Sequence, residues 1–150
     1  MNTSKEILES IELGNLLNKI ELQIKNIEIG DTHTEISNLM NLPYKSQIAN
    51  SNLREGAMKE LYEMLYNAFV LICKISLATS NENLLSIVDK SCSRIIALLS
   101  SCQFKIQKAP KANPLADLYN TTILHLQQNC KDRMFSDIKN LSNILFEECL

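Results

Sequence analysis

The chain has no tryptophan, few aromatic residues, and only three glycines and three prolines among its 150 residues. Because glycine and proline supply most of the tight turns in hairpins and sheets, a sheet-rich fold is not expected. Hydrophobic residues make up 45% of the chain, enough for one domain of this length to bury a core without metal ions or disulfide bonds. These totals predict an all-α protein.

An excess of charge of either sign is also missing. The chain has 15 Lys and Arg residues and 17 Asp and Glu residues, scattered along its length, which give a formal net charge of -2. This distribution offers no electrostatic footprint for nucleic acid. The opening residues MNTSKEILES carry charge where a secretory signal has its apolar core, and no run reaches the roughly 18 apolar residues of a membrane span. We therefore expect a cytoplasmic protein with no nucleic-acid partner and no membrane span.

Residues that support catalysis or metal binding are scarce. The two histidines, His33 and His125, cannot build a conventional site alone, and the spacing of His125 from Cys130 fits no usual zinc motif. The isolated glycines form no phosphate-binding loop. Five cysteines, an odd number, lie mostly at apolar helical positions and are expected to be free, buried thiols: Cys73, Cys92, Cys102, Cys130 and Cys149. We expect no enzyme activity, no catalytic residue, no metal and no cofactor; an enzyme built on His125 and a cysteine is the alternative.

The apolar pattern predicts a first amphipathic helix over residues 1–30. Thr3-Ser4-Lys5-Glu6 has the form of a capping box, and Gly30 is expected to end the helix. Its apolar residues follow steps of three or four: Ile7, Leu8, Ile11, Leu17, Ile20, Ile24 and Ile27. Residues 31–51 are rich in Asn, Ser and Thr and contain Pro43, so they are predicted to form a linker lying against the bundle, with one helical turn near 35–41.

Residues 52–150 carry four further helical patterns. The second helix is expected near 53–78, the third after an N-cap at Ser80 or Asn81, the fourth from Asn113-Pro114, and the fifth over 134–146. The turn between the second and third helices is short, which favours antiparallel neighbours. The predicted fold is an antiparallel up-and-down bundle of four or five helices.

The stretch ELYEMLYNAFVLICKI, residues 60–75, is apolar on more than the single stripe that a peripheral helix needs. Two interpretations stay open. This is either the central helix of the bundle, surrounded on most sides, or a helix with one flank left as a groove for a partner helix. In the second case the linker around Tyr44 is expected to occupy the groove when no partner is present.

Three segments resemble the FliS-type flagellar export chaperones, which are small cytoplasmic helical bundles that hold flagellin. They are LYEMLYNA (61–68), NENLLSIVDKSCSRIIALLSSCQF (81–104) and NPLADLYNTTILHLQQNCKDRMFSDIKNLSNILFEEC (113–149). The likeness lies in the order and spacing of the three segments. Typical members carry a Ser-Pro step before the first segment, where this chain has NLREGAMK, and they lack the 50 residues before it.

The resemblance implies a chaperone that binds flagellin or another export client in a groove and prevents its premature assembly. The residues expected to contact the partner are Tyr44, Leu61, Leu65, Tyr66, Tyr119 and Ile123. For each of them, packing in the core is an equal alternative. The additional N-terminal residues leave a second possibility, a co-chaperone that binds a FliS-type chaperone. A third is a helical adaptor that forms a homodimer through its first helix, with the seam Ile7, Ile11, Ile20, Ile24 and Ile27.

Overall fold

The computed structural model describes residues 4–40, 44–79, 81–106, 113–129 and 132–146, and at residues 4, 44–50, 113, 114, 129, 132 and 133 it describes the backbone alone. Over these ranges the chain forms five α-helices and no strand. The helices are α1 (Ser4–Leu39), α2 (Tyr44–Ala78), α3 (Glu82–Ser101), α4 (Asn113–Asn129) and α5 (Asp132–Leu145). The predicted all-α helical bundle is confirmed.

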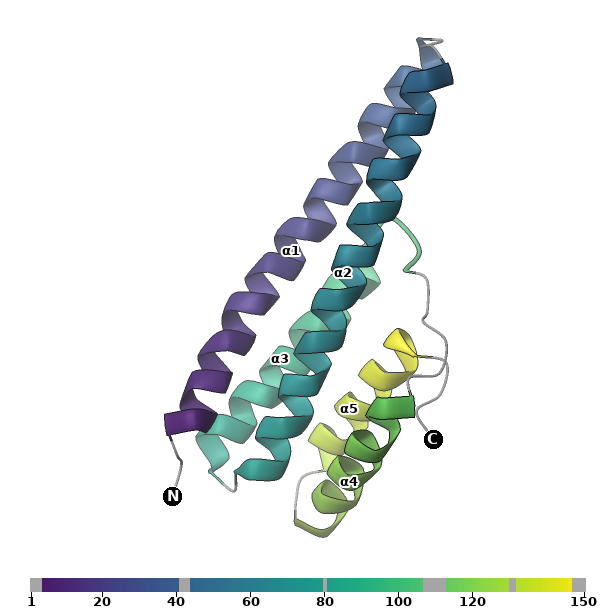
Figure 1. The fold of residues 1–150 in the computed structure, drawn as a ribbon. Helices are drawn as coiled ribbons and strands as arrows, with labels where there is room; N and C mark the ends of the chain where they lie inside the picture. The colour runs from purple at the N-terminus through teal and green to yellow at the C-terminus, as the bar shows by residue number, and fades with distance from the viewer. Residues whose placement is uncertain (1–3, 41–43, 80, 107–112, 130–131, 147–150) are drawn as a thin grey trace.

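Consecutive helices run in alternating directions (Figure 1). α1 and α2 form a long antiparallel hairpin, and α3 packs against both of them. α4 and α5 form a second, shorter hairpin, in which α4 contacts α2 while α5 contacts α3 and, less extensively, α2. α2 is therefore the one described helix that touches all four others.

This central position explains why the stretch 60–75 is apolar on several sides. The buried residues of α2 are Leu61, Leu65, Ala68, Phe69, Leu71, Ile72, Cys73, Ile75 and Ser76. All of them except Ser76 belong to one apolar cluster to which all five helices contribute. The buried hydroxyl of Ser76 donates to the carbonyl of Ile72 at 2.7 Å, so this polar group is satisfied inside the core.

The packing face of α1 follows alternating steps of three and four residues. Its buried residues are Glu6, Ser10, Leu13, Leu17, Ile20, Ile24 and Ile27. This spacing keeps one seam of a long helix directed at its neighbours. The placement of Ile7, Leu8 and Ile11 on the inward stripe is wrong, because all three are exposed. The seam fixed by residues 13–27 extends back to Ser10 and Glu6, and the Ser10 hydroxyl donates to the Glu6 carbonyl at 3.0 Å.

The predicted linker over residues 31–51 is wrong where the structure describes it, although the helical turn expected near 35–41 does lie within α1 as far as Leu39. α1 continues through Gly30 to Leu39, and α2 begins at Tyr44 instead of near Leu53. A glycine inside a helix costs only about 1 kcal/mol relative to alanine, which the hairpin contacts can offset. The hydroxyls of Thr32 and Thr34 donate to the carbonyls of Glu28 and Gly30 at 3.1 and 3.0 Å, and the side chains of His33, Glu35 and Asn38 are exposed. Pro43 lies outside the described residues.

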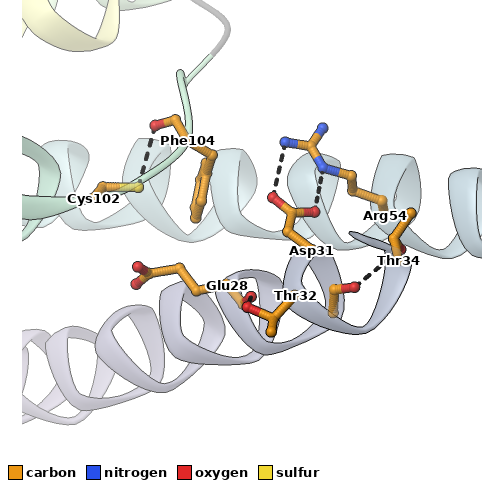
Figure 2. Close-up of polar contacts among 8 residues, drawn as sticks. Glu28, Asp31, Thr32, Thr34, Arg54, Cys102 and Phe104 are labelled. Carbon is orange, nitrogen blue, oxygen red and sulfur yellow. Dashed lines mark hydrogen bonds and ion pairs between the residues drawn. The ribbon is translucent and has the colours of Figure 1, made fainter. Parts of the chain in front are cut away.

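The far end of the hairpin projects beyond the other three helices (Figure 1). We call residues 28–39 of α1 and 51–60 of α2 the arm, and none of their described side chains is buried. One ion pair spans it, from the guanidinium of Arg54 to the carboxylate of Asp31 at 2.6 Å (Figure 2). At its base, the side-chain amide of Gln23 donates to the carbonyl of Ala57 at 3.0 Å.

Two predicted helix starts agree with the structure. The side chain of Asn81 caps α3 by accepting hydrogen bonds from the amides of Asn83 and Leu84, at 2.8 and 3.2 Å. α4 begins at Asn113, so Pro114 lies in its first turn, where a missing backbone donor costs little. The predicted capping residue Thr3 lies outside the described residues.

Candidate functional site

The predicted partner-binding residues lie mainly inside the bundle. Leu61, Leu65 and Tyr119 are buried, with exposed fractions of 1%, 0% and 4%. Tyr66 and Ile123 are half-buried and pack against the same core. Tyr44 is the first residue of α2, but its side chain lies outside the described part of the chain. A partner would reach the three buried side chains only if helices moved apart, so their binding role stays a prediction.

The tyrosines are held by an aromatic cluster centred on Phe146. The ring of Phe146 lies edge-on to Phe69, with centroids 5.4 Å apart, and edge-on to Tyr62 and Tyr66 at 6.2 and 6.3 Å. Tyr119 stacks on Phe69 at 6.3 Å. The Tyr62 hydroxyl donates to the carbonyl of Leu145 at 3.3 Å, which satisfies its polar end inside the protein. These contacts are those of a core, and they join α2, α4 and the end of α5.

An open groove runs between the first half of α1 and the second half of α2. Its volume is about 630 Å³, and it spans residues 8–19 of α1 and 67–74 of α2. The apolar lining consists of Leu8, Ile11, Leu16, Val70 and Leu71, and the polar lining of Glu12, Asn15, Lys19, Asn67 and Lys74. At 1.5 Å per residue, the α1 wall is roughly 16 Å long, which matches about three turns of a bound helix.

The α1 residues of this groove are absent from the predicted site. The sequence places Leu8 and Ile11 on the same apolar stripe as the buried Leu17 and Ile20, whereas the structure leaves them 64% and 57% exposed. The sequence signal that identifies them is the step of three and four residues. Counted back from Leu17 and Leu13, the step arrives at Ser10 and leaves Leu8 and Ile11 outside the seam.

A smaller pocket of about 220 Å³ lies at the base of the arm. It is lined on one side by Ile27, Gly30 and Asp31 and on the other by Leu53 and Arg54, among others. The hydrogen bond from Arg54 to Asp31 raises the pKa of this guanidinium. The pocket is apolar around one satisfied ion pair.

The three described cysteines are free thiols, as predicted, although only Cys73 and Cys92 are buried. Burial raises the pKa of the Cys92 thiol far above its usual range, with further contributions from Asp137, Cys73 and Asp89. Cys102 is half-buried, burial raises the pKa of its thiol, and the thiol donates a hydrogen bond to the Phe104 carbonyl at 3.3 Å (Figure 2). A raised pKa disfavours the thiolate, so these two cysteines lack the character of nucleophiles. Cys130 and Cys149 lie outside the described residues.

Within the ranges that the structure describes, no cluster of three or more His, Cys, Asp or Glu side chains is placed to hold a metal ion. His33 is exposed on the arm and His125 is half-buried on α4. Residues 51–78 of α2 are long and apolar enough, by length and composition, to cross a membrane. Half of the apolar window is buried inside the bundle, and the central helix of a soluble bundle meets the same criterion, so this is weak evidence for a membrane span.

Comparisons with models of known protein families, with curated proteins and with solved structures found no match. The likeness to the FliS-type chaperones is therefore neither supported nor opposed by a relative. The features of the molecule that bear on function are the groove between α1 and α2 and the faces that the helices expose.

Proposed function

We propose that the protein is a non-enzymatic export chaperone that holds an amphipathic helical segment of its client in the groove between α1 and α2. The observation that carries this proposal is the groove itself. It has an apolar floor at Leu16, Val70 and Leu71 and opens along its length to solvent. An amphipathic helix inserts its apolar face into such a groove through side chains spaced three, four and seven residues apart.

The rim of the groove suits a client segment of mixed charge. Lys19 and Lys74 lie on opposite walls, and Glu12 lies on the α1 wall. Such charges guide and orient a partner while the apolar floor supplies most of the affinity. A disordered client segment that folds in the groove gives up conformational entropy and regains free energy by burying apolar surface. The proposed activity therefore needs neither a catalytic group nor a nucleotide.

The class of client comes from the resemblance of residues 61–149 to the FliS-type chaperones. Flagellin, whose C-terminal segment such chaperones hold, is the first client to test. Because the client is captured before export, we place the protein in the cytoplasm. One feature favours a second candidate, a co-chaperone that binds a FliS-type chaperone. The α1 wall of the groove comes from the N-terminal helix that typical members of that family lack.

The test is a titration of the purified protein with a fluorescent peptide from the C-terminus of flagellin and, separately, with a FliS-type chaperone. The test variant is Val70→Lys, which places a charge on the half-buried floor of the groove. The matched control is Leu124→Lys, on an exposed part of α4 distant from the groove lining. Removing one apolar anchor of about 1.5–3 kcal/mol weakens binding roughly 10- to 100-fold.

Binding of the peptide that Val70→Lys weakens and Leu124→Lys leaves intact would support the client chaperone. Binding of the FliS-type chaperone with the same pattern would support the co-chaperone. Equal effects of the two variants, or binding to neither partner, would contradict the role of the groove. Thermal unfolding followed by circular dichroism checks that each variant is folded.

A further inference from the structure

The outward face of α1 carries an apolar stripe that the other described helices leave uncovered. Leu8, Leu22, Ile29 and Ile36 are 64%, 59%, 56% and 49% exposed. With Asn15, they occupy every seventh position from 8 to 36. In Figure 1, α1 lies along one edge of the molecule.

This stripe lies opposite the packing seam of the same helix. Two residues along an α-helix turn the chain by about 200°. Leu22 is two residues from both Ile20 and Ile24, which are buried, and Ile29 is two residues beyond the buried Ile27. The position farthest from the core is normally polar in a surface helix. Here it is apolar at four of its five occurrences.

Single exposed apolar residues are common on soluble proteins and need no explanation. Exposed apolar residues that recur at a fixed spacing along one face of a helix form a continuous apolar surface instead. The residues from 8 to 36 span about 42 Å at 1.5 Å each. A seven-residue repeat supplies one of the two core positions of a helix-pairing heptad, and the second position here holds Ile11, Asn18, Lys25 and Thr32. The face is thus suited to a long, straight helix carrying a repeat of the same period.

We propose that α1 pairs with α1 of a second copy of this chain, in parallel and in register. The exposed area supports a second copy as the occupant. The four apolar residues and the neighbouring Ile11 each expose on the order of 100 Å². Two copies together would bury about 1,000 Å² from these side chains alone, the lower limit for a specific interface, before any flanking residue is counted.

The position of Asn15 supports the parallel register. In that register each stripe residue meets its own copy, so apolar residues meet apolar residues and Asn15 meets Asn15. A single polar Asn in an apolar seam specifies register in this way. An antiparallel pairing of the whole stripe would set Asn15 against Ile29 of the second copy.

The residues of this interface differ from the homodimer seam expected from the sequence. Ile20, Ile24 and Ile27 are buried in the protein's own core and are not available to a second copy. Leu8, Ile11 and Asn15 also line the client groove, whereas Leu22 and Ile29 do not, so substitutions at positions 22 and 29 test the pairing without changing the groove.

The test is sedimentation equilibrium of the full chain between about 1 and 100 µM. We expect a mass approaching twice the 17.0 kDa of the single chain. Leu22→Lys and Ile29→Lys should each raise the dimer dissociation constant at least 10-fold. Leu124→Lys, which changes a residue of matched exposure (58%) on α4, should leave it unchanged. A monomer at 100 µM, or a dimer that both stripe variants leave intact, would overturn the proposal.

The register is tested by Asn15→Cys, oxidised under mild conditions and mapped by mass spectrometry against the wild-type chain treated identically. A parallel, in-register pair places the two introduced thiols opposite each other and should yield a peptide crosslinked through position 15. A dimer without that crosslink would overturn the parallel register. Val70→Lys should leave the mass unchanged, so a failure of the client groove and a failure of the dimer are distinguishable.

Discussion

The Cys92 side chain couples the stability of the bundle to pH. Burial holds the pKa of this thiol well above its ordinary value. In the unfolded chain the same thiol ionises near pH 8.5. Above that pH the unfolded state therefore binds fewer protons than the folded state, and the free energy of unfolding falls as pH rises. The loss is about 1.4 kcal/mol per pH unit for a thiol that stays protonated in the folded protein.

We expect urea unfolding of the wild type to show this contribution as a decline above about pH 9 and no contribution from Cys92 below about pH 7.5. Because Lys and Tyr residues also titrate at high pH, the readout is the difference between the wild type and Cys92→Ala. The variant should lose stability less steeply between pH 8 and 10. Parallel slopes for the two proteins would show that the thiol ionises equally in the folded and unfolded states.

The tyrosines show why a partner site could not be read from residue type. A Tyr ring buries well while its hydroxyl seeks a polar group, so Tyr66 and Tyr119 fit a partner surface as well as a core. The deciding factor is the ring of Phe146, some 80 residues from Tyr66 in sequence, which the fold brings to 6.3 Å from it. Contacts of this range leave no local pattern in the sequence.

At the scale of the elements, the start of a helix was predictable where a capping residue or a proline marks it in the sequence. Asn81 and Pro114 mark helix starts through groups within one turn of themselves, and both starts agree with the structure. The boundary at Gly30 failed because a glycine can either end a helix or lie inside one. The contacts that decide between these outcomes come from the other helix of the hairpin, including the ion pair of Asp31 with Arg54.

The continuous α1 makes a prediction for Gly30 that the sequence alone does not. A Cβ atom added at Gly30 meets no atom within 4 Å, and the residue is exposed inside a helix. Gly30→Ala should therefore stabilise the protein by about 0.5–1 kcal/mol, because alanine loses less backbone entropy on folding. The free energy of unfolding in urea, followed by circular dichroism, measures the change.

Gly14→Ala is the matched control, since Gly14 also lies within α1 and its added Cβ meets no atom within 4 Å. The two substitutions should have the same sign. If Gly30 instead ended the helix in a left-handed conformation, alanine there would destabilise the protein while Gly14→Ala would still stabilise it.

At the scale of the whole molecule, the bundle and the arm differ in what holds them. The body of α2 from Leu61 to Ser76 packs against four helices, whereas none of the described side chains of the arm is buried. The apolar pattern predicted the bundle because a core leaves a periodic signature. It could not predict the arm, whose helical form depends on hairpin contacts among polar residues.

This difference predicts a gradient of amide hydrogen exchange along single helices. Helices without buried contacts open locally at low free-energy cost, whereas core helices exchange only when the domain unfolds. At about 1 µM protein, amides of residues 51–58 should exchange orders of magnitude faster than those of residues 65–76 of the same helix. Mass spectrometry of peptic peptides resolves the two segments, and equal protection would mean that the arm is as stable as the core.

The same experiment at 100 µM separates the arm from the proposed pairing of α1. Pairing covers Ile29 and Ile36, so protection over residues 28–39 should rise with concentration, and Ile29→Lys should abolish the rise. Because Leu53 lies on α2 and outside the stripe, residues 51–58 should change less than residues 28–39. A rise in both segments to the same extent would mean that a second copy binds the whole arm. A rise in neither, with a dimer present, would show that the copies meet on another face of the bundle.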